Sequence, residues 1–198
     1  MKVTLRRYLK MNYKLNVPYY AQNDNDLWDG VAGNVQCAST SNTMLLAFIK
    51  PDFVAESVKR KYDEPESYYK WGFDNLGYSA DDRGNHDIHT KVLSYFGLET
   101  VWKTDLTRAD ISKALSGGFP VVVGLEYKTA GHICIIVGET DEGYLIHDPN
   151  GIRSGTANEY TYINPGNGDM SGSYDLYTWA SLKVLLFVGG SAWGRLRK

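Results

Sequence analysis

Residues 131–149, GHICIIVGETDEGYLIHDP, decide how the chain is organised. Residues 131–137 and 144–147 are short apolar runs with many β-branched side chains, a composition that favours strands. Residues 141–143, Asp-Glu-Gly, form a turn between them. The preceding residues 120–127 have the same strand-like composition. The second half of the chain is therefore predicted to form an antiparallel meander.

The first half of the chain has helical patterns instead. A helix is predicted to open near Cys37, with Ser39 or Ser41 as its cap, and to stop at Pro51. Further helices are predicted over residues 52–60 and 87–96, and after the capping box of Thr107 and Asp110. We expect Gly97 to be left-handed, Gly117-Gly118 to end the last helix, and residues 64–83 to be irregular and aromatic. Helices that precede strands, without alternating with them, predict an α+β fold.

Composition excludes several classes of protein. The chain has 198 residues, of which 43% are hydrophobic and 22% charged, as in globular rather than disordered proteins. We interpret 1–198 as a single domain, with 1–16 as a basic N-terminal arm. No apolar run approaches the roughly 20 residues that span a bilayer, so membrane insertion is not expected. A net charge of −2 gives no general attraction to nucleic acid.

The basic residues gather at the two ends of the chain. Lys2, Arg6, Arg7, Lys10 and Lys14 precede the first acidic residue, and Arg195, Arg197 and Lys198 lie at the C-terminus. Solvated ends are the simpler interpretation of such runs. The alternative is loose attraction to a polyanionic surface such as a cell envelope.

Cys37, His132 and Asp148 are the candidate catalytic residues. The unpaired N–H groups and the dipole of a helix N-terminus stabilise a thiolate at Cys37. Catalysis by a thiolate also needs an imidazole and a group that orients it. His132 follows Gly131 on one predicted strand, and Asp148 directly follows the next. The alternative for Cys37 is a small buried hydrophobic residue.

Other candidate sites are weaker. His86 and His89 lack a third and fourth zinc ligand, so surface histidines on a helix are the simpler interpretation. Asp24, Asp26 and Asp29 resemble a calcium loop in composition, but the EF-hand pattern fails, and a looser calcium site stays open. No cofactor and no metal are expected.

Two residues compete with the candidate site along the same strands. Neighbouring strand residues face opposite ways, so His147 points away from the site if Asp148 points toward it. Cys134 shares the parity of His132 and either lines the same cleft or packs in the core, which we favour.

The order of these motifs resembles a known family. The matching motifs are Val17-Pro18-Tyr19-Tyr20-Ala21-Gln22, Cys37 with Thr40-Ser41 and Met44, Gly131-His132, and His147-Asp148-Pro149. They resemble the free-standing form of the bacteriocin-processing, double-glycine-leader type of papain-like cysteine peptidase. The resemblance implies a papain-like fold with Cys37 as nucleophile, His132 as base and Asp148 as orienting acid. It also implies that Gln22 donates its amide to an oxyanion hole, across the long loop 24–36.

The same resemblance extends to phage lysis enzymes, partly through the Gly/Tyr-rich tail 164–177. It implies a monomeric hydrolase that cuts peptide cross-links of peptidoglycan. With two cysteines and no signal sequence, we expect retention in a reducing cytoplasm until a membrane lesion releases the protein. One alternative is a peptidase that processes proteins or leader peptides. Another is a non-catalytic envelope-binding module whose surface is the aromatic segment 68–78.

Overall fold

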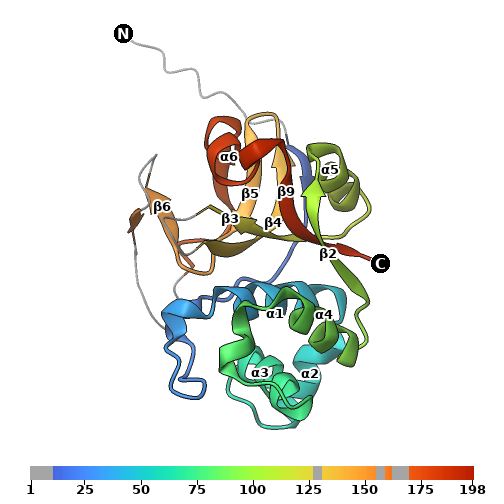
Figure 1. Cartoon of the computed structure of the whole chain (residues 1–198), viewed down its shortest axis with the longest axis vertical. Helices are drawn as coiled ribbons and strands as arrows, with labels where there is room; N and C mark the ends of the chain where they lie inside the picture. Colours follow the sequence, from blue (N-terminus) through green and yellow to red (C-terminus); the bar gives the residue numbers. More distant parts are fainter. Residues whose placement is uncertain (1–10, 127–130, 155–158, 162–169) are drawn as a thin grey trace.

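The computed structural model describes residues 11–126, 131–154, 159–161 and 170–198, and it divides into a helical half and a sheet half (Figure 1). Helices α1–α4, which we call the helical lobe, gather below the main sheet, and α5 and α6 lie above. The α-helices are α1 (Cys37–Ile49), α2 (Pro51–Lys59), α3 (Pro65–Asn75), α4 (His86–Tyr95), α5 (Arg108–Ser116) and α6 (Trp179–Leu185). Short 3₁₀ helices are η1 (Gln22–Asp24), η2 (Gly33–Val35), η3 (Ala80–Gly84) and η4 (Val188–Gly190).

The main sheet is antiparallel, with the strand order β2-β9-β3-β4-β5-β8. Its strands are β1 (Met11–Lys14), β2 (Thr100–Leu106), β3 (Val121–Leu125), β4 (His132–Thr140), β5 (Gly143–His147), β8 (Asp175–Thr178) and β9 (Ala192–Arg197). β1 pairs with the last residues of β4, beyond the part that pairs with β3. β6 (Ile152–Ser154) and β7 (Glu159–Thr161) form a separate pair. The predicted meander is β3-β4-β5, so the mixed helix and antiparallel-sheet architecture is confirmed.

Each face of the sheet buries its own core. Alternate residues of β3 and β4 point to opposite faces, as the period of a strand requires. Val122, Ile135 and Val137 pack with the helical lobe. Val123, Cys134 and Ile136 pack with residues of α5 and α6 on the other face. β4 therefore runs through the middle of the molecule, and its first residue, His132, lies at the end of the strand.

Most local predictions for the helices are confirmed. α1 begins at Cys37 and ends before Pro51, which opens α2. Thr107 and Asp110 form the predicted capping box of α5. Gly97 and Gly118 have φ values of 79° and 77° after their helices. These features depend on residues that are neighbours in the chain, so they can be predicted from the sequence.

The predicted cap of α1 is wrong. The N-cap residue is Gln36, whose side chain makes no capping bond. Ser39 and Ser41 lie inside the first turns of the helix. Their hydroxyls donate to the carbonyls of Gln36 and Ile133 instead.

The prediction of an irregular aromatic segment at 64–83 is also wrong, because it contains α3 and η3. Pro65 is the first residue of α3, a position where its missing N–H costs nothing. Tyr68, Tyr69 and Phe73 of α3 are buried in the helical lobe. Most of the aromatic residues over 68–78 therefore build a core, whereas Trp71 and Tyr78 stay partly exposed.

The expectation of a solvated C-terminal basic end is wrong for Arg195. Its side chain is fully buried on β9 and donates to the hydroxyls of Thr90 (2.7 Å) and Thr100 (2.8 Å) and to the carbonyl of His86 (3.0 Å). Arg197 is exposed. Lys2, Arg6, Arg7 and Lys10 lie outside the described residues, as does much of the Gly/Tyr-rich tail.

Candidate active site

Cys37 is the first residue of α1 and is a free, partly exposed thiol. Unpaired N–H groups and the positive end of the helix dipole surround this position and favour a thiolate. Burial alone would raise the pKa of the thiol. The hydrogen bond and charge of His132 and the backbone N–H of Ile133 outweigh burial, so the pKa of Cys37 lies below its ordinary value. Such a thiol is suited to nucleophilic attack.

His132 joins Cys37 to Asp148. Its Nε2 atom lies 2.7 Å from Oδ1 of Asp148, and His132 also makes the hydrogen bond that lowers the pKa of Cys37. His132 is 6% exposed and Asp148 is fully buried. A buried carboxylate that bonds one imidazole nitrogen holds the ring in one tautomer and orientation.

Asp148 is held by more than His132. Tyr177 donates its hydroxyl to Oδ2 at 2.6 Å, and the backbone N–H of Asn150 donates to Oδ1 at 2.9 Å. Burial would raise the pKa of Asp148, but His132 and these two donors keep it below its ordinary value. The carboxyl group is therefore ionised at neutral pH. The hydrogen bond from Tyr177 to Asp148 was not predicted, because no local sequence signal indicates that β8 pairs with β5.

The charge of His132 follows from the same contacts. Burial lowers the pKa of the imidazole, whereas Cys134 and Asp148 raise it, and the result lies well above its ordinary value. Burial raises the pKa of Cys134, so that thiol is neutral and Asp148 supplies the charge at neutral pH. With the pKa of Cys37 lowered and that of His132 raised, a thiolate and an imidazolium are favoured together.

Gln22 lies in the same cleft as Cys37 and His132. Its side chain is 1% exposed, and its Oε1 atom has no hydrogen-bond partner within the described part of the chain. Its backbone N–H donates to the carbonyl of Pro149 at 2.8 Å, which fixes it beside the turn that follows Asp148. The structure thus brings together the four residues singled out in the sequence.

Cys134 is fully buried beneath the site and does not line the cleft. It packs in the core shared with α5 and α6, as favoured from the sequence. His132, Cys134 and Asp148 are the three metal-ligating side chains that the described residues bring within 4.8 Å of one another. His132 and Asp148 already use their facing atoms in a mutual hydrogen bond, and the buried thiol of Cys134 also hydrogen-bonds His132, so we interpret the group as an acid–base pair with a neutral cysteine beside it.

The rival residues have structural partners. His147 faces away from the cleft: its Nε2 atom bonds the carbonyl of Val17 and its Nδ1 atom accepts from the N–H of Tyr174. His89 is not a surface histidine, because it is fully buried and bonds Tyr69 and Arg83. Neither the two histidines of α4 nor the three aspartates of loop 24–36 join a group of three metal-ligating side chains among the described residues.

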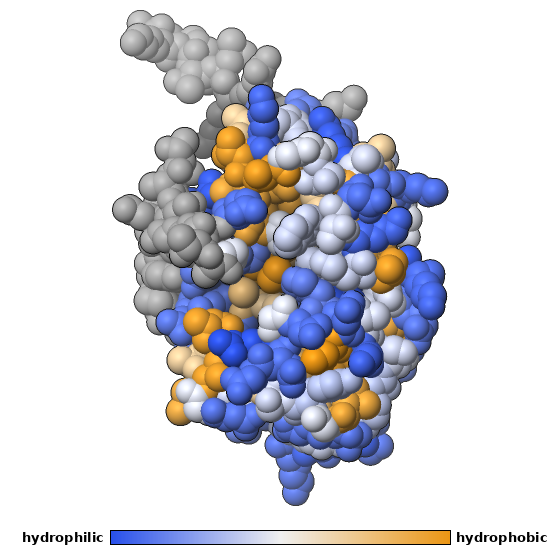
Figure 2. Space-filling model, viewed as in Figure 1, coloured by the Kyte–Doolittle hydropathy of each residue, from blue (hydrophilic) through white to orange (hydrophobic). Residues whose placement is uncertain are grey.

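The cleft runs between the helical lobe and the sheet and has a volume of about 690 Å³. Gly124, Trp193 and Gly131 line its sheet side, and Arg83 and Gly84 line the side of the lobe. Leu185, Leu186 and Val188 add an apolar wall near α6. In the view of Figure 1, a hydrophobic patch lies at the upper left of the surface, near α6, and smaller hydrophobic patches are scattered among hydrophilic residues lower down (Figure 2).

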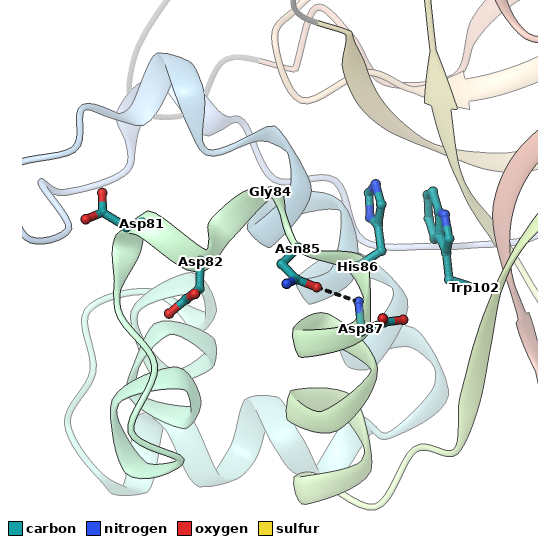
Figure 3. A pocket seen from close by; sticks show the side chains of 7 residues that line it. All are labelled: Asp81, Asp82, Gly84, Asn85, His86, Asp87 and Trp102. Carbon is teal, nitrogen blue, oxygen red and sulfur yellow. Dashed lines mark hydrogen bonds between the residues drawn. The ribbon is translucent and has the colours of Figure 1, made fainter.

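A side pocket of about 600 Å³ adjoins this cleft and shares Asp81, Gly84 and His86 with it. The rings of His86 and Trp102 stack with their centroids 3.6 Å apart. Figure 3 shows the two rings face to face, with the side chains of Asp81 and Asp82 along the other end of the pocket. Burial and Arg195 lower the pKa of His86 to about 4, so its ring is neutral at pH 7.

A thiol at a helix N-terminus facing a histidine and a carboxylate on an antiparallel sheet defines an arrangement typical of cysteine peptidases. Comparison with known proteins agrees with this class. The model of the "Peptidase_C39 like family" matches residues 14–179, and the chain belongs to this family. Membership supports a hydrolase of the cysteine peptidase class and agrees with the peptidase resemblance in the sequence.

One of two similar solved structures supports the fold. A double-glycine-motif protease from an AMS/PCAT transporter, crystallised with its leader peptide, is 12% identical, with a TM-score of 0.53 over 95% of both chains. A putative C39-like peptidase from Bacillus anthracis is 14% identical, with a TM-score of 0.47 over 97% of this chain and 99% of the other. At such identities the first comparison supports a shared fold alone. No curated protein matches the sequence.

The structure also bears on the membrane. None of the helices in the described segments is both long enough and apolar enough to span a bilayer.

Proposed function

We propose that the protein hydrolyses peptide or amide bonds with Cys37 as nucleophile, His132 as acid and base, and Asp148 as the group that orients His132. The chain of contacts from the helix-start thiol through His132 to the buried Asp148 carries this proposal. The thiolate attacks the carbonyl carbon, and the C–N bond breaks as His132 gives its proton to the leaving amine. Water then attacks the thioester with His132 as base, which releases the carboxylic acid and the free thiol.

Gln22 and the first N–H groups of α1 are proposed to hold the oxyanion of the tetrahedral intermediate. Rotation of the Gln22 amide exchanges the places of Oε1 and Nε2. Such a rotation would put Nε2, a hydrogen-bond donor, where the unpartnered Oε1 lies, in the side chain that lines the cleft. Donors placed where charge develops lower the barrier without reorganising at the moment of reaction.

The proposed substrate is a peptide cross-link of peptidoglycan, cut by a monomer that a membrane lesion releases from the cytoplasm. The likeness of the motifs to phage lysis enzymes supports this choice. The test is incubation with purified peptidoglycan followed by mass spectrometry of the released fragments. We expect new amine termini with the wild type and none with Cys37→Ala. New reducing sugar ends would indicate a glycosidase and overturn the assignment.

Leader-peptide processing is the second candidate. It is favoured by one observation, that the solved structure with a TM-score of 0.53 is a double-glycine-motif protease in complex with a leader peptide. Parallel digestion of peptides with and without a Gly-Gly pair separates the candidates. Cleavage after Gly-Gly, with no fragments from peptidoglycan, would replace the first substrate by the second.

A non-catalytic envelope-binding module is the remaining alternative, and three of the five aromatic residues of its proposed surface, Tyr68, Tyr69 and Phe73, are buried. The reactivity of the Cys37 thiol distinguishes the binding module from the peptidase. A module has no reason to activate Cys37, so alkylation no faster than that of free cysteine at pH 6 would favour it.

A further inference from the structure

The loop between Gln22 and Cys37 folds back on itself, so that Gly33 lies against Gln22. The Cα of Gly33 packs so closely on Gln22 that an added Cβ would lie 2.2 Å from the Gln22 carbonyl oxygen. At its other side, Gln22 is bonded to Pro149. The position of Gln22 relative to Cys37 therefore depends on the shape that the loop adopts over residues 25–36.

The side chain of Gln36 holds that shape from the inside. It is fully buried and uses both ends of its amide. Nε2 donates to the carbonyls of Asp26 and Val31, each at 3.0 Å, and Oε1 accepts from Nδ2 of Asn25 at 3.1 Å. Because Gln36 directly precedes Cys37, these bonds tie three points of the loop to the start of α1.

Lys70 completes the network from the helical lobe. Its side chain is 6% exposed, and its Nζ atom lies 3.5 Å from Oε1 of Gln36 and 3.5 Å from the carbonyl of Asp26. Oε1 of Glu64 forms an ion pair with the same Nζ atom at 3.5 Å. A buried charge is costly unless it is paired and hydrogen-bonded, so this arrangement is specific rather than incidental.

We propose that Gln36 and Lys70 are positioning residues, which act on the reaction by holding the loop that places Gln22 at the oxyanion. The inference rests on the proposed function, because it acts through the role proposed for Gln22. Neither residue lines the cleft, so neither is expected to touch the substrate. The thiolate depends on other contacts, those of Cys37 with His132 and Ile133.

Two reactions of the Cys37 thiol distinguish the effect of the oxyanion site from the reactivity of the thiolate itself. Acylation by p-nitrophenyl acetate passes through a tetrahedral oxyanion, whereas alkylation by iodoacetamide displaces iodide at a CH₂ group and forms no oxyanion. A misplaced oxyanion donor therefore slows acylation and leaves alkylation unchanged. The ratio of the two rate constants reports on the oxyanion site and needs no knowledge of the natural substrate.

The variants are Gln36→Met and Lys70→Met, with Lys59→Met as the matched control, because Lys59 is an exposed lysine that pairs only with Glu56 in the described structure. We expect the acylation-to-alkylation ratio to fall by about 10-fold or more in Gln36→Met and by a smaller factor in Lys70→Met. Alkylation should stay within about twofold of the wild type in both, since it depends on groups the variants do not touch. Lys70→Arg, which keeps a donor, should restore part of the ratio.

A double variant tests whether Gln36 acts through Gln22. Residues that act as one unit are not additive, so Gln22→Ala/Gln36→Met should lose no more acylation than Gln22→Ala alone. Additive losses, an unchanged ratio in Gln36→Met, or a parallel fall of alkylation would each overturn the inference. An unchanged ratio in Gln22→Ala would instead remove the role of Gln22 from the proposed function.

Discussion

His132 presents Nε2 to Asp148 at 2.7 Å, and the same carboxylate accepts from Tyr177 at 2.6 Å. Asp148 is thus fixed between two side chains from different strands of the sheet. This leaves the imidazole little freedom to rotate. The ring is therefore oriented toward Cys37 before any substrate binds, a preorganisation that supports proton transfer.

Asp148→Asn is expected to lower the rate of hydrolysis by roughly 10⁴-fold, less than the loss in Cys37→Ala. Asparagine keeps an acceptor for the imidazole but removes the charge that stabilises the imidazolium. The measurement is the rate at which new amine termini are released from purified peptidoglycan, with variants compared at matched stability. Tyr177→Phe keeps the carboxylate and serves as the milder control. Equal loss in Asp148→Asn and Cys37→Ala would contradict an orienting role.

The rate of alkylation should report the shifted pKa values. The thiolate of Cys37 forms at lower pH than that of free cysteine, because its pKa is lowered by His132 and the N–H of Ile133 more than burial raises it. Cys37 should therefore react with iodoacetamide faster than free cysteine at pH 6, and mass spectrometry should show Cys134 unmodified. A rate at pH 6 no greater than that of free cysteine would show that the thiol is not activated.

Glu66 makes the stability of the helical lobe depend on pH. It is 3% exposed, and burial together with Glu64 raises its pKa from 4.5 to about 8. Between these values the folded state holds a proton that the unfolded state releases, so the free energy of unfolding falls as pH rises from 4.5 to 8.

Glu66→Gln should remove that dependence. We expect its Tm to exceed that of the wild type by roughly 5 °C at pH 8 and to match it at pH 4.5, measured by thermal denaturation. Glu56→Gln, on the exposed side of α2, should change neither. The same difference in Tm at both pH values would mean that Glu66 does not titrate on unfolding.

Arg195 links the two halves of the molecule, since it bonds Thr90 and His86 of α4 and Thr100 of β2 from β9. Arg195→Leu is expected to cost about 3 kcal/mol of unfolding free energy, because it leaves buried polar partners unsatisfied. Arg197→Leu, two residues further and exposed, should cost little. Chemical denaturation measures both, and equal values would show that the buried bonds contribute nothing.

The sequence predicted the features that depend on neighbours in the chain. Pro51, Gly97 and the capping box at Thr107 each act within a few residues, and each lies where expected. Adjacent antiparallel strands also favour nearness of His132 and Asp148, but their register could not be derived from local patterns, and the family resemblance supplied the roles of the two residues.

Features built by distant segments were missed. α3 was missed because its burial depends on contacts with other segments: Tyr68 packs on Phe53 of α2 and on Phe96, which follows α4. β9 pairs with β2, which lies more than 80 residues earlier, so the burial of Arg195 had no local signal. Tyr177 and the bonds of Gln36 depend on tertiary contacts in the same way.

Catalysis through Cys37 requires an acyl-enzyme in which the acyl group is bonded to the Cys37 sulfur. The direct measurement is intact-protein and peptide mass spectrometry after brief exposure to p-nitrophenyl acetate. We expect one acetyl group on Cys37 in the wild type and in Cys134→Ala, and none in Cys37→Ala. Acetylation that persists in Cys37→Ala and is lost in Cys134→Ala would contradict it.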